Sequence, residues 1–213
     1  MDREKEREKL VARLLSFGYL KSKKVADAML KVPREEFIPY EQSARAYEDR
    51  PLEIGFGQTI SAPHMVATMT EALDVKPKHK ILEIGSGSGY QAAILAELAK
   101  EGKIYTIERI ENVKNFAERN LKQLGYKNVL VLLGDGTLGY KEKAPYDRII
   151  VTAAAPKVPK AMVSQLKLSG KMLIPVGGRT YQKLLLIEQI EKRIKEKNIC
   201  DCVFVPLIGK DGW

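Results

Sequence analysis

Residues 81–89 read Ile-Leu-Glu-Ile-Gly-Ser-Gly-Ser-Gly, and this stretch decides the fold of the chain. It is a short apolar strand that runs into three alternating glycines. The segment that follows, residues 90–99, is rich in Ala and Leu and is typical of a helix. Glycine tolerates positive φ angles and lets a ligand approach the backbone closely. A strand, a glycine loop and a helix in this order are compatible with a cofactor site, including one for NAD, but the loop alone could also be an ordinary tight turn.

Apolar segments of strand length recur after this loop, and segments of helix length separate most of them. We expect strands at 80–84, 104–107, 129–133, 148–151, 171–175, 184–190 and 200–205, and helices at 63–73, 90–99, 113–124 and 159–166. Helices between successive strands imply parallel pairing, because a parallel connection needs a long crossover. The expected fold class is therefore α/β, a Rossmann-like doubly wound and mostly parallel sheet with helices on both faces.

The first sixty residues differ from this pattern and predict a small helical N-terminal extension. Apolar residues recur at helical spacing near 10–15 and 25–30, and Pro33 ends the second helix. Prolines and glycines in the stretch 34–58 predict an extended, ordered loop. The length of 213 residues fits one domain, which we divide into an extension, 1–61, and a cofactor-binding α/β core, 62–213.

The charge of Glu83, just before the glycines, helps to decide between two kinds of cofactor. It would repel the pyrophosphate of NAD, which must lie against the loop and the helix N-terminus. S-adenosylmethionine instead carries a sulfonium, an ammonium and one carboxylate, which suit an acid followed by backbone amides. Glu108 and Asp135 end the next two expected strands, where they can accept hydrogen bonds from ribose hydroxyls and an adenine amine. Glu108 would serve the ribose of NAD equally well, so the three acids at consecutive strand ends favour an adenosyl cofactor, and Glu83 favours S-adenosylmethionine over NAD.

Several stretches of sequence on either side of the glycine loop indicate a more specific class of protein. They are Val32–Phe37 (VPREEF), Gly55–Met65 (GFGQTISAPHM), Tyr146–Pro156 (YDRIIVTAAAP), Leu168–Gly177 (LSGKMLIPVG) and Phe204–Leu207 (FVPL). These runs resemble protein-L-isoaspartate O-methyltransferases, which are class I S-adenosylmethionine-dependent methyltransferases. The resemblance implies methyl transfer to the free carboxylate of L-isoaspartyl residues in damaged proteins and peptides. The resulting ester would collapse to a succinimide and hydrolyse partly to normal aspartate.

The resemblance also implies roles for individual residues. Ser61 matches the serine at the reacting centre and is the expected catalytic residue, and the extension 1–61 would contribute to the substrate site. The expected cofactor-binding residues are Thr59, Ile60, His64, Glu83, Gly85, Ser86, Gly87, Glu108, Asp135 and Gly136, and the expected substrate-binding residues are Gln58, Val205 and Pro206. Many family members have aspartate where this chain has Glu83.

Two of these residues have a second interpretation. Ser61 before Ala62-Pro63 could be a helix N-cap, and His64 could pack in the first turn of that helix rather than face the cofactor. A substrate carboxylate is already ionised at neutral pH and needs no general base, so proximity, alignment and removal of water remain for the enzyme. A Ser–His nucleophile pair is not expected, because no third orienting group is evident.

The composition of the chain indicates which classes of partner the protein would not bind. The net charge is +9, but the basic residues are scattered among acids, which favours a solvated surface over a nucleic-acid site. The apolar runs are too short for a bilayer, and two cysteines are too few for a closed zinc site. We expect a cytoplasmic monomer that binds no nucleic acid, membrane or metal. The alternatives are an RNA or small-molecule methyltransferase and a non-catalytic adenosyl- or nucleic-acid-binding module.

Overall fold

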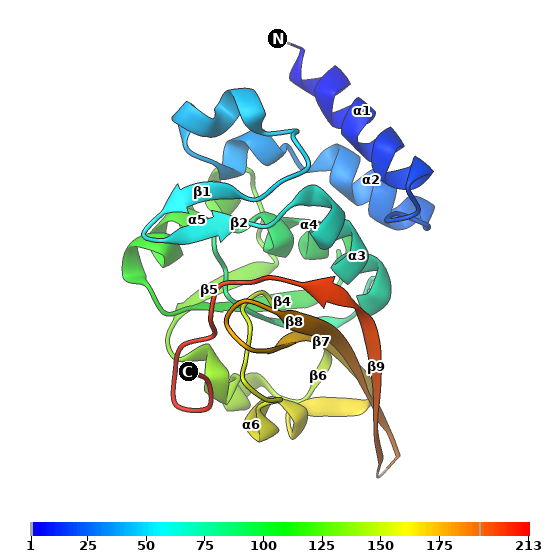
Figure 1. The fold of residues 1–213 in the computed structure, drawn as a ribbon, viewed down its shortest axis with the longest axis vertical. Coiled ribbons are helices and arrows are strands. Elements are labelled where there is room, and N and C mark those ends of the chain that lie inside the picture. The colour runs from blue at the N-terminus through cyan, green and yellow to red at the C-terminus, as the bar shows by residue number, and fades with distance from the viewer. Residues whose placement is uncertain (1, 192) are drawn as a thin grey trace.

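A seven-stranded sheet organises the molecule (Figure 1). The computed structural model describes residues 2–191 and 193–213; positions 1 and 192 of the expected single domain lie outside the described residues. The strands of this sheet are β3 (Lys80–Ile84), β4 (Lys103–Glu108), β5 (Val129–Leu133), β6 (Tyr146–Val151), β7 (Leu166–Gly177), β8 (Gln182–Ile190) and β9 (Arg193–Cys202). Their spatial order is β5-β4-β3-β6-β7-β8-β9.

The first five strands pair in parallel, and β8 and β9 add to the sheet as antiparallel strands. The expected Rossmann-like, mostly parallel sheet is therefore confirmed. From β3 the chain builds outward to β4 and β5, then returns to place β6 on the other side of β3. Ligands of such sheets bind beyond the carboxyl ends of the strands at this point of reversal.

Helices cover the two faces of the sheet unequally (Figure 1). One face carries α3 (Pro63–Leu73), α4 (Tyr90–Leu98) and α5 (Glu111–Gln123), with α1 (Arg3–Ser16) and α2 (Lys23–Lys31) outside them. The other face carries α6 (Lys160–Val163) and the 3-10 turns η3 (Gly136–Leu138) and η4 (Lys141–Lys143). α6 is shorter than expected because Leu166 already pairs with Tyr146 in the sheet. Within the described ranges, no helix has the length and apolar character needed to cross a membrane.

The stretch 34–58 is not the extended loop that its prolines and glycines predicted. It forms the 3-10 turns η1 (Arg34–Phe37) and η2 (Tyr40–Arg45), and then a hairpin of β1 (Leu52–Gly55) and β2 (Gln58–Ile60). The turn of this hairpin, Gly55-Phe56-Gly57, has positive φ angles at all three residues, which explains its two glycines. Strands of three and four residues are too short to show an alternating pattern in the sequence.

The last strand also differs from its expected range, 200–205. β9 occupies Arg193–Cys202, because a hairpin with β8 pairs Ile190 with Arg193. The first six residues of β9 are exposed and mostly charged, so they lack the apolar pattern of a buried strand. After Cys202 the chain leaves the sheet and crosses the end of β6, where Val205 O accepts a 2.8 Å hydrogen bond from the amide of Ala154.

Candidate active site

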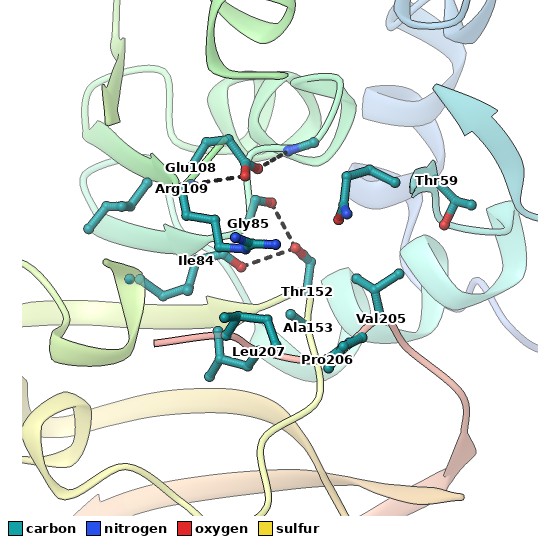
Figure 2. Close-up of a pocket in the computed structure, with 15 residues that line it drawn as sticks. Thr59, Ile84, Gly85, Glu108, Arg109, Thr152, Ala153, Val205, Pro206 and Leu207 are labelled. Atoms are coloured by element: carbon teal, nitrogen blue, oxygen red, sulfur yellow. Dashed lines mark hydrogen bonds between the residues drawn. The ribbon is translucent and has the colours of Figure 1, made fainter. Parts of the chain in front are cut away.

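Two adjoining cavities open at the carboxyl ends of the parallel strands and share Thr59, Gly85, Gly87 and Thr152. We refer to them together as the crevice, part of which Figure 2 shows. The predicted site residues that line it are Gln58, Thr59, Ile60, Ser61, Gly85, Ser86, Gly87, Glu108, Gly136, Val205 and Pro206. The other three, His64, Glu83 and Asp135, do not line it. The glycine loop and the N-terminal hairpin therefore meet the C-terminal segment here.

Thr152, which the sequence interpretation missed, holds the glycine loop against the end of β6. Its Oγ1 lies 3.0 Å from Ile84 O and 2.7 Å from Gly85 O, the two contacts dashed in Figure 2. Gly85 has a φ of 92°, and a Cβ on it would come within 2.4 Å of Thr152 Oγ1. Only glycine fits this close approach. Thr152 directly follows β6, so the rule that ligand sites follow parallel strands could have found it.

Glu108 connects β4 to the glycine loop. Its Oε2 accepts a 3.2 Å hydrogen bond from Gly87 N, and its Oε1 accepts from Arg109 N at 2.9 Å and Ile110 N at 3.1 Å. A carboxylate offers about four acceptor positions, so these amides leave about one for a ligand hydroxyl. The buried carboxylate therefore fixes the loop and lines the crevice at the same time.

Glu83 lies inside the fold rather than in the crevice. Alternation along β3 directs it to the face opposite Leu82 and Ile84, and it is fully buried. Neither carboxylate oxygen has a hydrogen-bond partner among the described residues. Burial raises the pKa of Glu83 to about 8; the Thr106 hydroxyl partly offsets the rise, and the nearby Glu108 charge adds to it. The acid predicted to face the cofactor ammonium is thus mostly neutral at pH 7 and points elsewhere.

Asp135 holds the C-terminal segment rather than lining the crevice. Its Oδ1 accepts hydrogen bonds from Thr137 N at 2.9 Å and Thr137 Oγ1 at 2.6 Å, and its Oδ2 accepts from Lys210 N at 2.8 Å. Burial alone would raise the pKa of Asp135, but the hydrogen bonds from Lys210 and Thr137 outweigh it and lower the pKa. The next residue, Gly136, does line the crevice.

The start of α3 resolves the second interpretation of Ser61. The N-cap of α3 is Ala62, and no side chain at that position caps the helix, so the interpretation of Ser61 as a cap is wrong. The free amide of His64 instead donates to Asp49 Oδ1 at 2.9 Å, and His64 Nδ1 lies 2.9 Å from the same oxygen. In the part of the chain that the structure describes, the Ser61 hydroxyl has no hydrogen bond and remains available to a ligand.

Asp49 is therefore an orienting group for His64 that the sequence did not reveal. The two residues are separated by a hairpin and are brought together only by tertiary structure. His64 lines a separate groove and packs against Tyr19, with 5.2 Å between ring centroids and the two rings tilted by 42°. No hydrogen bond joins His64 to Ser61 among the described residues. Asp49 nevertheless supplies the third orienting group that the sequence did not show, so the reason given for expecting no Ser–His nucleophile pair was wrong, and the expectation itself stays a prediction.

A buried arginine fixes the backbone of Ser61. Arg34 Nη2 donates to Ser61 O at 2.9 Å, and its Nε donates to Ala46 O at 2.9 Å. The guanidinium carbon lies 5.0 Å from the centroid of the Tyr90 ring. Burial lowers the pKa of Arg34, while Tyr90 and Asp49 oppose this effect. Arg34 appeared in the sequence only as part of a family motif, and its position among Val32, Pro33 and Phe37 gave no sign of this contact.

Comparison with models of protein families shows the family of the chain. The model of the family described as "Protein-L-isoaspartate(D-aspartate) O-methyltransferase (PCMT)" matches residues 5–212. The chain belongs to this family. All residues of the crevice lie inside the matched range.

Relatives with the protein-L-isoaspartate O-methyltransferase name match over nearly the whole chain. One from Methanopyrus kandleri is 58% identical over 210 residues, covering 97% of this chain and 93% of that protein. One from Staphylothermus marinus is 53% identical over 218 residues, covering 99% and 97%. A crystal structure from Plasmodium falciparum that carries the same family name is 29% identical, with a TM-score of 0.85 and coverage of 95% of this chain and 98% of that chain. That protein is in complex with S-adenosyl-L-homocysteine.

Proposed function

We propose that the protein transfers a methyl group from S-adenosylmethionine to the free carboxylate of L-isoaspartyl residues in damaged proteins and peptides. The ester leads through a succinimide to normal aspartate. The observation that carries this proposal is the family match over residues 5–212, because that range includes every residue of the crevice. The family name and the ligand of the Plasmodium falciparum structure give the substrate class and the cofactor.

The crevice suits S-adenosylmethionine. Gly87 has no side chain, and the nearest atom to an added Cβ would be Ile54 Cδ1 at 3.8 Å, so its backbone is open to a ligand. Glu108 has an acceptor position left for a ribose hydroxyl, and Ile84 and Ile107 supply apolar walls. The cofactor, when bound, supplies a methyl group activated by the sulfonium. The chain's part is to bind and orient both reactants and to exclude water.

We propose Ser61 as the residue that orients the reacting carboxylate, through a hydrogen bond donated by its hydroxyl. Two observations support this role: the hydroxyl has no partner among the described residues, and buried Arg34 holds the Ser61 backbone. No base is needed, because a carboxylate with a pKa of about 4 is ionised at neutral pH. Gln58 from the extension 1–61, together with Val205 and Pro206, would contact the substrate at the mouth of the crevice.

Radiolabelled methyl transfer tests the function directly. A synthetic peptide with one isoaspartyl residue should be labelled, and the same peptide with aspartate should not. Equal labelling of both peptides, or of neither, would refute isoaspartyl methylation. Labelling of RNA in place of either peptide would favour the alternative RNA methyltransferase. The monomeric state and the cytoplasmic location stay predictions, and light scattering in solution tests the first of them.

A further inference from the structure

The charges that line the crevice cancel. In the part of the chain that the structure describes, its charged side chains are Glu108 and Arg109, one negative and one positive. S-adenosylmethionine carries one net positive charge, because its sulfonium adds to an ammonium and a carboxylate that balance each other. A sulfonium holds no proton that it could release, so its charge persists in a buried site. It therefore needs a negative charge that the lining of the crevice does not supply.

Glu83 is an acid directly behind this lining. It lies on β3, two residues before Gly85, and its carboxyl group is fully buried on the face of the sheet that α3 and α4 cover. Neither carboxyl oxygen has a hydrogen-bond partner among the residues described. Burial without partners disfavours a polar group, and such a group in a native fold calls for an explanation. Compensation of a charge in the crevice supplies one.

Two hydroxyl groups connect Glu83 to the crevice. Thr106 pairs with Glu83 in the register of β3 and β4, so both side chains lie on the same face of the sheet, and the Thr106 hydroxyl lowers the pKa of Glu83. Thr106 Oγ1 lies 2.7 Å from Ser86 Oγ, and Ser86 lines the crevice. A hydroxyl group can accept one proton while it donates another. Thr106 and Ser86 therefore form a route for a proton between the buried carboxyl group and the crevice.

The other charged groups around Glu83 leave it mostly neutral. Burial is the main cause that raises its pKa to about 8, and the charge of Glu108 adds to the rise. Arg34 and Tyr90 contact each other, with 5.0 Å between the guanidinium carbon and the ring centroid, and Arg148 binds backbone carbonyls at the end of α3. Three more charged or titratable side chains of α3 and α4 bind residues of the N-terminal extension: His64, Glu71 and Glu97. A cation in the crevice would favour the ionised form of Glu83.

We propose that Glu83 responds to the charge of the cofactor. It releases its proton through Thr106 and Ser86 when a ligand with a sulfonium occupies the crevice, and it takes a proton back when a neutral thioether remains. In the methyl transfer between these states, the sulfur keeps the electron pair of the broken carbon–sulfur bond, so Glu83 exchanges only its own proton with water. The inference rests on the proposed function, because it assigns the crevice to the cofactor. Its consequence is that the protein prefers the charged cofactor to the spent one.

Calorimetry of ligand binding tests this proposal without any methyl transfer. The enthalpy of binding is measured at pH 7 in two buffers that differ in ionisation enthalpy, and the difference gives the number of protons released. We expect the wild-type protein to release more than about half a proton with S-adenosylmethionine and almost none with S-adenosylhomocysteine. The ratio of the two affinities should then rise about fivefold in favour of S-adenosylmethionine between pH 6 and pH 7.

Three variants assign the proton to its residue. Glu83→Gln should abolish both the proton release and the pH dependence of the affinity ratio, and it should leave the affinity for S-adenosylhomocysteine unchanged. The ammonium of each ligand is the same in both proteins, so the difference between wild type and variant reports Glu83 alone. Glu118→Gln, on the exposed surface of α5, is the matched control and should behave as wild type. Thr106→Val removes the hydroxyl that lowers the pKa of Glu83, so it should move the rise of the ratio to higher pH, and it decides the question if Glu83→Gln fails to fold.

The outcomes separate this inference from the function on which it rests. Equal proton release with both ligands, release that persists in Glu83→Gln, or an unchanged profile in Thr106→Val would each overturn the inference. If the protein binds neither ligand, the crevice is not the cofactor site and the inference falls with it. Failure of isoaspartyl methylation alone would look different, because the protein would bind both ligands with the expected proton release and still leave the isoaspartyl peptide unlabelled.

Discussion

The backbone amide of Lys210 donates a 2.8 Å hydrogen bond to Asp135 Oδ2, so the C-terminal segment is held against the loop that follows β5. The residues just before Lys210 in the sequence, Leu207 and Ile208, line the crevice. Asp135 therefore shapes the crevice, which we propose as the cofactor site, through the segment that it holds, although its own side chain does not line the crevice. This relationship differs from the direct adenine contact that the sequence predicted for Asp135.

Removal of this hydrogen bond should weaken cofactor binding. Asp135→Ala and Lys210→Pro each remove one partner of the bond, and a hydrogen bond to a charged group is worth about 1.5–3 kcal/mol. We expect both variants to weaken S-adenosylhomocysteine binding about tenfold or more by calorimetry. Lys210→Ala keeps the backbone amide and serves as the control with normal affinity. If Lys210→Pro binds normally while Asp135→Ala does not, the bond to Lys210 is not what shapes the crevice, and Asp135 acts through Thr137 or through the ligand itself.

Glu83 should make the stability of the protein depend on pH. Its pKa is about 8 in the folded state and near the ordinary value of 4.5 in the unfolded chain. Between these values the folded protein keeps a proton that the unfolded chain has released. Its contribution to stability is therefore complete below pH 4.5 and falls as the pH rises towards 8.

The substitution Glu83→Gln should abolish this dependence, because the amide is neutral throughout. The free energy of unfolding in urea should fall between pH 5 and pH 8 in the wild-type protein, and it should fall less over the same range in Glu83→Gln. Glu118→Gln, on the exposed surface of α5, should follow wild type. Parallel pH profiles for wild type and Glu83→Gln would mean that Glu83 is ionised in the folded protein.

Substitutions of Ser61 and Asp49 should have different effects: the first should lower turnover, and the second should lower the stability of the fold. Ser61→Ala removes the donor that orients the reacting carboxylate, and we expect kcat to fall about 100-fold with S-adenosylhomocysteine affinity nearly unchanged. Its unfolding free energy should stay close to wild type, because Ser61 caps no helix. Asp49→Ala should instead cost about 0.5–2 kcal/mol of stability, since Asp49 binds the free amide of His64. Normal turnover in Ser61→Ala would exclude the orienting role.

Arg34 should influence the site through the backbone of Ser61. Arg34→Lys keeps the charge but cannot reach both Ser61 O and Ala46 O with the same geometry. We expect a loss of about 2–3 kcal/mol in unfolding free energy and a lower kcat at unchanged cofactor affinity. The exposed side chain of Arg50 provides the control, and Arg50→Lys should stay within about 0.5 kcal/mol of wild type. Equal effects of the two substitutions would contradict this role of Arg34.

The parts of the fold that depend on local pattern could be predicted. The strand before Gly85 was predicted with its exact bounds, and so was the helix at 63–73. A strand buried on both faces leaves a short continuous apolar run, and an amphipathic helix leaves a periodic one. β9 was misplaced because its exposed half carries charges instead of apolar residues. The β1–β2 hairpin was missed because its strands are shorter than any detectable period.

A residue of the site could be predicted if it directly follows an expected strand or lies in one of the stretches that resemble the family. Glu108 and Gly136 satisfied this condition and line the crevice. The contacts of Asp49 and Arg34 were not predictable, because each joins residues that only the folded chain brings together. Glu83 shows a further limit: its position beside the glycines was clear, but the direction of its side chain depends on the pleat of β3.

The two walls of the crevice come from positions far apart in the chain, with Thr59 near the beginning and residues 205–208 near the end. Contacts of such large sequence separation raise the contact order and form late, because loop-closure entropy must be overcome first. The crevice, our proposed cofactor site, should therefore be among the last features to assemble during folding, and a partly folded chain should not bind the cofactor. Once bound at about 100 times its dissociation constant, a ligand adds about 2.7 kcal/mol to native stability. Cofactor supply would then also protect the enzyme from unfolding.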